Sequence, residues 1–133
     1  MKDIELEEGR DLTSCETLIM KTIWDEKEDI SAIDLRRKLK ERYGKDYSRT
    51  TLATFLIKMS DKGFVKNYRV GRNAYVHATK SEEEYKQELL EDTRRFWFAG
   101  KTEELVCALF KKRKVSKEEI ANIRRQLDEL DDD

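Results

Sequence analysis

The sequence is poor in the residues on which several protein classes depend. Its 133 residues contain no proline, one histidine, two cysteines and five isolated glycines. Because no glycine belongs to a G-x-G or phosphate-binding loop, the nucleotide-binding motifs are absent. Two cysteines cannot form a disulfide framework, which points to a reducing compartment. No segment approaches the roughly 18 apolar residues of a membrane span, and the N-terminus lacks a signal-peptide core. We therefore expect a folded cytoplasmic protein without membrane insertion.

Residues for catalysis or metal binding are equally scarce. The single histidine, His77, falls in a strand-like segment, and no clustered carboxylates accompany it. Neither an acid/base pair nor an activated nucleophile can be assigned, so we do not expect an enzyme. Cys15 and Cys107 are too far apart in the sequence for a thiolate metal motif. We expect both to be small core residues, and we expect no metal or cofactor.

Charge, by contrast, is abundant and unevenly distributed. Charged residues make up 43% of the chain, and the formal net charge is −1. Residues 1–35 carry 4 basic and 11 acidic residues, residues 36–80 carry 13 and 3, and residues 81–133 carry 11 and 15. The near-neutral total therefore hides a basic middle third, which favours a localised contact with a polyanion such as DNA.

Apolar periodicity predicts three helices and a β-hairpin within residues 10–80. The helices are expected over residues 13–24, from Ser31 toward Gly44, and from Ser48 to Gly63. Residues 64–70 and 74–78 are rich in β-branched and aromatic residues, and a tight basic turn joins them. Three helices followed by a hairpin is the order of a winged helix-turn-helix domain, so we expect a mainly α fold.

Residues 81–133 are predicted to form a helical dimerisation domain. Helices are expected over residues 81–100, over residues 102–112 and from Ser116 onward. Short helices of this charge density bury little surface alone, so association with a second copy is expected, with packing on the N-terminal domain left open. The expected interface residues are Tyr85, Leu89, Phe96, Trp97, Leu105, Leu109, Ile120, Ile123, Leu127 and Leu130.

The basic third supplies a candidate DNA-binding face on the third helix. Its inward side is filled by Leu52, Phe55, Leu56 and Met59, so the opposite side faces outward. There, arginine can reach guanine, threonine can bond either kind of base, and an alanine or threonine methyl can contact thymine. Because the flanking blocks are net acidic, an ordinary solvated face is disfavoured. The candidate DNA-binding residues are Arg36, Lys45, Arg49, Thr50, Thr51, Ala53, Thr54, Lys58, Arg69 and Arg72.

These motifs resemble the penicillinase-repressor family of winged-helix repressors (the BlaI/MecI/CopY type). The resemblance spans about residues 12–130, in the same order and spacing. It lies in Glu16, Met20 and Trp24 of the first helix, in Ser48, Thr51, Thr54, Leu56 and Lys58 of the recognition helix, in Gly71, Arg72 and Tyr75 of the wing, and in residues 81–85.

The resemblance implies a homodimeric repressor that binds a palindromic operator and is released by an induction signal. In one branch of the family, a membrane sensor of β-lactams triggers proteolysis within the dimerisation region. The corresponding bond here is Ala108–Leu109, where the family's usual Asn-Phe is missing. The paired Cys-x-Cys motifs of the copper-responsive branch are also missing. The alternative function is a winged-helix module that binds protein and has no specific DNA site.

Overall fold

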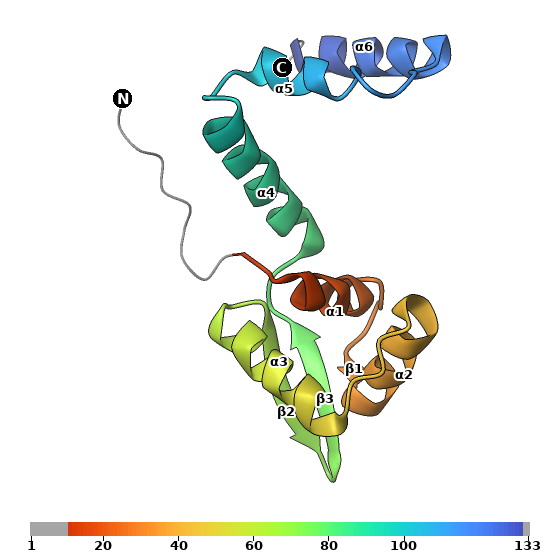
Figure 1. Cartoon of the computed structure of the whole chain (residues 1–133), viewed down its shortest axis with the longest axis vertical. Helices are drawn as coiled ribbons and strands as arrows, with labels where there is room; N and C mark the ends of the chain where they lie inside the picture. The colour runs from red at the N-terminus through yellow and green to blue at the C-terminus, as the bar shows by residue number, and fades with distance from the viewer. Residues whose placement is uncertain (1–10, 132–133) are drawn as a thin grey trace. The chain divides into compact units, whose positions relative to one another are not determined.

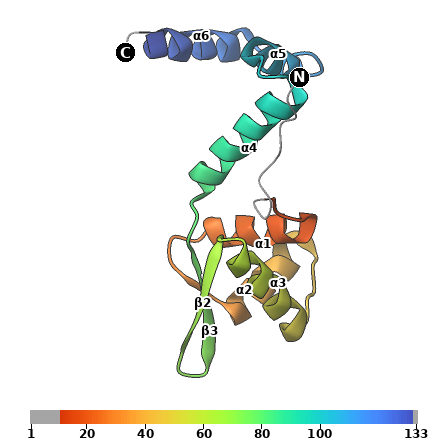
Figure 2. The ribbon, with the colours of Figure 1, turned by 90° about the vertical axis from the view of Figure 1, so that its left-hand side faces the viewer.

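A computed structural model describes residues 11–131. Helices predominate, and one small antiparallel sheet has the strand order β1-β3-β2 (Figures 1 and 2). The elements are α1 (Ser14–Trp24), β1 (Ile30–Ser31), α2 (Ala32–Tyr43), α3 (Arg49–Asp61), β2 (Val65–Val70), β3 (Asn73–Ala78), α4 (Glu82–Trp97), α5 (Thr102–Ala108) and α6 (Lys117–Asp131). The predicted mainly α, winged helix-turn-helix architecture is confirmed. No described helix is both long and apolar enough to cross a bilayer.

The three helix starts of the winged domain follow the predicted capping residues. Thr13 accepts a hydrogen bond from the backbone N–H of Glu16 at 3.2 Å, and the Glu16 carboxylate accepts from the N–H of Thr13 at 2.9 Å. This reciprocal pair satisfies two N–H groups that the helix itself leaves free. Ser31 and Ser48 cap α2 and α3 with one side-chain bond each, accepting from the backbone N–H of Asp34 and of Thr51 at 3.1 Å.

The sheet differs from the prediction in one strand and in its turn. Ile30 and Ser31 form the additional strand β1, which pairs with β3. The prediction missed β1 because two residues are too few to show a strand periodicity. The hairpin register pairs Val70 with Asn73, so its turn contains only Gly71 and Arg72. Gly71 has φ +62°, a left-handed conformation that such two-residue turns require and that glycine adopts without strain.

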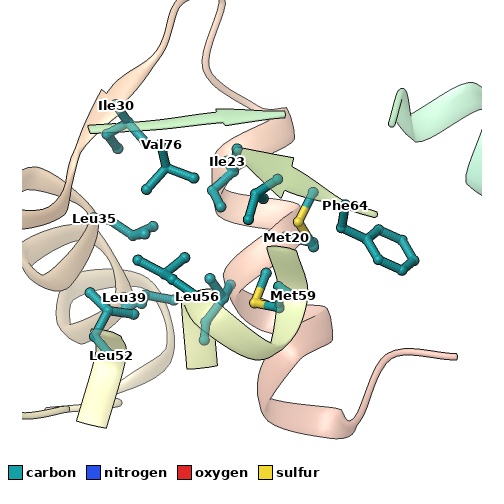
Figure 3. Close-up of a cluster of buried hydrophobic side chains, with 12 residues drawn as sticks. Met20, Ile23, Ile30, Leu35, Leu39, Leu52, Leu56, Met59, Phe64 and Val76 are labelled. Atoms are coloured by element: carbon teal, nitrogen blue, oxygen red, sulfur yellow. The ribbon is translucent and has the colours of Figure 1, made fainter. Parts of the chain in front are cut away.

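The core of the winged domain lies between α1, α2, α3 and the sheet (Figure 3). The expected inward residues of α3 are buried, except Phe55, which is half-buried against Tyr47 at a ring-centroid distance of 5.3 Å. The buried hydrophobic residues are Ile19, Met20, Ile23, Ile30, Leu35, Leu39, Leu52, Leu56, Met59, Phe64, Val65 and Val76.

The chain divides into two compact units between Leu90 and Glu91, within α4. The first turns of α4 pack on the winged domain, since the Tyr85 ring lies 5.6 Å from Trp24 and 5.4 Å from Phe64 between centroids. Trp24 also donates its indole N–H to the carbonyl of Lys80 at 2.8 Å. The first unit therefore includes the start of α4.

The second unit holds the rest of α4 together with α5 and α6. None of these three helices buries a residue within the single chain. Helix α5 ends at Ala108, earlier than predicted, and α4 ends at Trp97.

Cys15 is half-buried but Cys107 is exposed, so the expectation of a core position is wrong for Cys107. The physical reason is that, among the described residues, no packing of α5 is extensive enough to bury any of its side chains.

Candidate nucleic-acid interface

Helix α3 presents all of its predicted DNA-binding residues to solvent. Its apolar residues recur every three or four positions and are held against α1 and α2, which turns the intervening residues outward. The exposed candidates on α3 are Arg49, Thr50, Thr51, Ala53, Thr54 and Lys58. Lys45 is also exposed, in the loop that precedes the helix.

A hollow of about 810 Å³ lies between α3, the first turns of α2 and the β2–β3 hairpin. Figures 1 and 2 show the hairpin extending beside α3. The hollow brings together four predicted arginines, Arg36, Arg49, Arg69 and Arg72, with apolar walls between them. Its described lining contains no carboxylate, so the hollow is electropositive. The candidates Lys45, Thr50, Thr51, Thr54 and Lys58 do not line it.

Ion pairing separates the basic residues of the middle third into two groups. Six of the 13 basic residues between 36 and 80 contact a carboxylate. They are Arg37 with Asp34, Lys38 with Glu26, Lys40 with Asp46, Arg42 with Asp25, Lys62 with Glu16 and Lys80 with Glu88.

The remaining basic residues have no carboxylate partner among residues 11–131. They are Arg36, Lys45, Arg49, Lys58, Lys66, Arg69 and Arg72. All but Lys66 belong to the candidate DNA-binding residues given above, and Lys66 is exposed on β2 of the same hairpin. Positive charge without a carboxylate partner is therefore concentrated around α3 and the wing. If these side chains contact DNA phosphates, they displace the counterions that surround the DNA, which favours binding.

Two of the arginines also hold the backbone around the site. Arg36 donates from Nε to the carbonyl of Tyr47 at 3.1 Å, which ties α2 to the loop before α3. Arg69 donates to the carbonyl of Arg72 at 3.2 Å across the hairpin turn. Asn67 joins the hairpin to α3 by donating to the carbonyl of Leu56 at 3.1 Å. The recognition helix and the wing are therefore held by direct hydrogen bonds.

The threonines of α3 differ in the hydrogen bonds that they leave available. Thr54 donates its hydroxyl proton to the carbonyl of Thr50 at 3.0 Å, so toward a ligand it offers a methyl group and an acceptor. Thr51 accepts from the Ser48 hydroxyl at 2.8 Å and keeps its own proton. Thr51 can therefore donate to a base edge, whereas Thr54 cannot while its helical bond persists.

Sequence reasoning missed the residue that anchors the wing, Asp29. This carboxylate accepts from the Tyr68 hydroxyl at 2.6 Å and lies 2.8 Å from Nδ1 of His77. The hydrogen bond from Tyr68, followed by that from His77, lowers the pKa of Asp29. The partners are 39 and 48 residues away in the chain. No local sequence signal could have revealed the contact.

Tyr47 supports the start of α3 from the other side. Its ring packs on Phe55, and its hydroxyl is buried with no hydrogen-bond partner among the described residues. The nearby thiol of Cys15 and burial raise the pKa of Tyr47 to about 12. Tyr47 therefore remains neutral at physiological pH and serves as an apolar support for the recognition helix.

The predicted dimerisation residues fall into three classes of exposure. Tyr85 packs within the first unit, while Leu105 and Ile123 are half-buried. The others are exposed, with Trp97 the most open at 76%. They are Leu89, Phe96, Trp97, Leu109, Ile120, Leu127 and Leu130.

Helices α5 and α6 also form an apolar groove within the second unit. Its volume is about 530 Å³. Its walls include Val106, Phe110, Ile120, Ile123 and Leu127, most of which are exposed in the single chain. Ala108, half-buried, is the last residue of α5, and the exposed Leu109 follows it.

Comparisons with known proteins agree with this architecture. A family model described as penicillinase repressor matches residues 12–129. A RosR complex named hsRosR-S1 is 21% identical, with 91% of this chain and 99% of that chain covered, at a TM-score of 0.54. H. salinarum RosR from crystals grown from NaBr is 19% identical, with coverages of 92% and 99% and a TM-score of 0.54. No curated protein matches the chain. At these identities the structural likeness concerns the fold alone.

Proposed function

The chain belongs to the penicillinase repressor family, and we propose that it represses transcription by binding a palindromic operator as a homodimer. In this proposal, residues 10–80 form the DNA-binding domain and residues 81–133 form the dimerisation domain. The observation that carries the DNA-binding role is the group of unpaired cations around α3 and the wing. The other basic side chains of the middle third pair with carboxylates of the chain.

Each copy places α3 in the major groove and the wing on the flanking backbone. Arg49, Thr50 and Thr51 lie in the first turn of α3, the part of a recognition helix that usually meets base edges. Arg36, Lys45, Arg69 and Arg72 bind phosphates and fix the register of the protein on the duplex. Two half-sites about one helical turn apart match the two-fold symmetry of a dimer. Occupation of the operator excludes RNA polymerase from an overlapping promoter.

The dimer is supported by the unpartnered apolar surface of the second unit. Large hydrophobic side chains exposed over several helices commonly mark a protein–protein interface. In this unit they lie on α4, α5 and α6, including Phe96, Trp97 and Leu127. A second copy that covers this surface supplies the core that the single chain lacks.

Release from the operator follows from separation of the two copies. Cleavage after α5 would have this effect because it cuts α6 from the rest of the chain. The Ala108–Leu109 bond lies at this position, and the exposure of Leu109 supports access by a protease.

A gel-shift titration with genomic fragments at several salt concentrations tests the DNA-binding role. Phosphate contacts alone should give detectable duplex binding at about 50 mM salt, and a specific operator should persist at higher salt. Absence of any duplex binding at low salt would refute the repressor and favour the alternative, a winged-helix module that binds protein.

Substitution of a wing arginine should weaken binding to every duplex. Arg72→Ala removes one side chain that is proposed to contact a phosphate. We therefore expect the slope of the logarithm of the binding constant against the logarithm of the salt concentration to fall in magnitude by about one unit. Arg37→Ala is the matched control because Arg37 is an exposed arginine of the same segment that already contacts Asp34 and Glu41. Equal salt slopes for wild type and Arg72→Ala would remove the wing from the interface.

A further inference from the structure

Ile57 is an exposed isoleucine on the recognition helix. Its side chain is 60% accessible, although the same helix buries Leu52, Leu56 and Met59 completely or nearly so. Arg49, Ala53 and Ile57 are spaced four residues apart, and all three line the hollow beside the wing. Residues at this spacing share one face of a helix. Ile57 is therefore not needed for the core, and it lies on the surface that the proposed function directs toward DNA.

The partner of such a side chain on duplex DNA is restricted by chemistry. Phosphates are charged, and base edges in the major groove present hydrogen-bonding groups, except for the 5-methyl group of thymine. The neighbouring Thr54 has already donated its hydroxyl proton within the helix. The middle of α3 therefore presents methyl groups and few donors, whereas Arg49 supplies donors at its N-terminal end.

We propose that Ile57, together with Ala53, is a specificity-determining residue that contacts the 5-methyl group of a thymine in each operator half-site. The inference rests on the proposed DNA-binding function and adds the kind of base that the middle of the helix selects. Ile57 follows Arg49 by eight residues, which is about 12 Å along a helix. At about 3.4 Å per base, the thymine lies within three or four base pairs of the base that Arg49 faces.

Replacement of thymine by deoxyuridine removes only the methyl group and tests this contact directly. A binding duplex is first selected from a random-sequence library with the full-length protein. Each thymine is then replaced singly, and the dissociation constants are measured. At one thymine per half-site we expect wild-type affinity to fall about threefold to fourfold, the effect of one lost methyl contact. Ile57→Ala should lose most of this difference between the thymine and uracil duplexes, because only the smaller Ala53 methyl group remains.

Ile33→Ala provides the matched control. Ile33 is also an exposed isoleucine of the hollow, at 67% accessibility, but it belongs to α2. This variant should keep the full uracil penalty. Thermal unfolding should give nearly the same midpoint for Ile57→Ala as for wild type, since an exposed side chain contributes little to stability.

The outcomes separate this inference from the proposed function. If no duplex is selected or bound, both are wrong. If wild type binds a specific duplex but is indifferent to uracil at every thymine, the inference is wrong and the repressor function stands. A uracil penalty of full size in Ile57→Ala would also overturn the inference. If the penalty disappears in Ile33→Ala instead, the methyl group is read by α2.

Discussion

Glu16 is a carboxylate inside the winged domain, with only 1% of its surface accessible. Its partners are the ammonium of Lys62, at 2.6 Å, and the N–H of Thr13. Burial raises the pKa of Glu16, but the hydrogen bonds from Lys62 and Thr13 outweigh burial and hold this pKa below its usual value of 4.5. The contact joins the start of α1 to the end of the recognition helix. Glu16 therefore takes part in the capping box of α1 and also holds the C-terminal end of α3 through Lys62.

The lowered pKa of Glu16 predicts a loss of stability in acid. Because the carboxylate is more acidic in the folded chain, its contribution is complete above about pH 4.5 and is lost as pH falls through the folded-state pKa. Glu16→Gln should lower the free energy of unfolding at pH 7 by about 2 kcal/mol, since it leaves Lys62 without its charged partner. It should also flatten the pH dependence below 4.5.

Urea unfolding at several pH values measures both effects. Glu41→Gln is the control, because Glu41 forms a solvent-exposed pair with Arg37 at 3.4 Å, and such pairs contribute little to stability. An unchanged acid dependence in Glu16→Gln would show that other carboxylates govern acid unfolding.

Among the elements, the hairpin depends on a residue outside it. Asp29 precedes β1 and contacts Tyr68 on β2 and His77 on β3. The short strand β1 adds a third row of backbone pairing, which joins β3 to the start of α2. A two-stranded hairpin alone is marginally stable in water, so these contacts define the position of the wing.

Removal of the Asp29 contact should loosen the wing without unfolding the domain. In Asp29→Ala, we expect faster amide hydrogen exchange in β2 and β3 and an unchanged rate in α1, because the local opening free energy of the hairpin falls. Since Tyr68 and His77 lower the pKa of Asp29, wild type should show the same loosening as pH falls below about 3.8.

Asp34→Ala is the control for this exchange experiment. Asp34 is an exposed acid near the same connection, but it pairs with Arg37 on its own helix. Equal exchange in the hairpins of wild type and Asp29→Ala would show that strand pairing alone holds the wing.

At the scale of the whole molecule, the division of the chain within α4 decides which fragments fold. The proposed boundary between the two domains is residue 80, and contacts of the start of α4 cross it: the Tyr85 ring packs on Trp24 and Phe64, and Glu82 pairs with Lys21 at 2.5 Å. The start of α4 thus completes the aromatic cluster of the first unit.

Two truncated chains distinguish these boundaries. A chain ending at Leu90 should fold and sediment as a monomer, because it keeps the Tyr85 packing and lacks the exposed apolar surface of residues 91–133. A chain ending at Lys80 should be less stable by about 1–2 kcal/mol, since it exposes Trp24 and Phe64. Thermal unfolding and sedimentation measure both properties. If the chain that ends at Leu90 sediments as a dimer, the dimer interface lies within residues 1–90 instead.

The sequence by itself determined the helices of the winged domain, their caps and the face that each one buries. Thr13, Ser31 and Ser48 act on neighbours three residues away, and a helix repeats its buried face every three or four residues, so both signals are local. The same locality made the outward residues of α3 predictable. The family resemblance followed from these motifs because they occur in the expected order and spacing.

Only the tertiary structure decided which charges remain free. In the sequence, Arg37 and Arg72 are equivalent, yet the fold places Asp34 and Glu41 beside the first and no carboxylate of residues 11–131 beside the second. It also added β1, the Asp29 contact and the packing of Tyr85. Each depends on residues that are distant in the chain, and pairing over such distances is set by the packing of the core and not by local periodicity. The fold thus divides the basic residues of the middle third into two groups. One group is neutralised by nearby carboxylates, and the other remains available around α3 and the wing for the proposed contact with DNA.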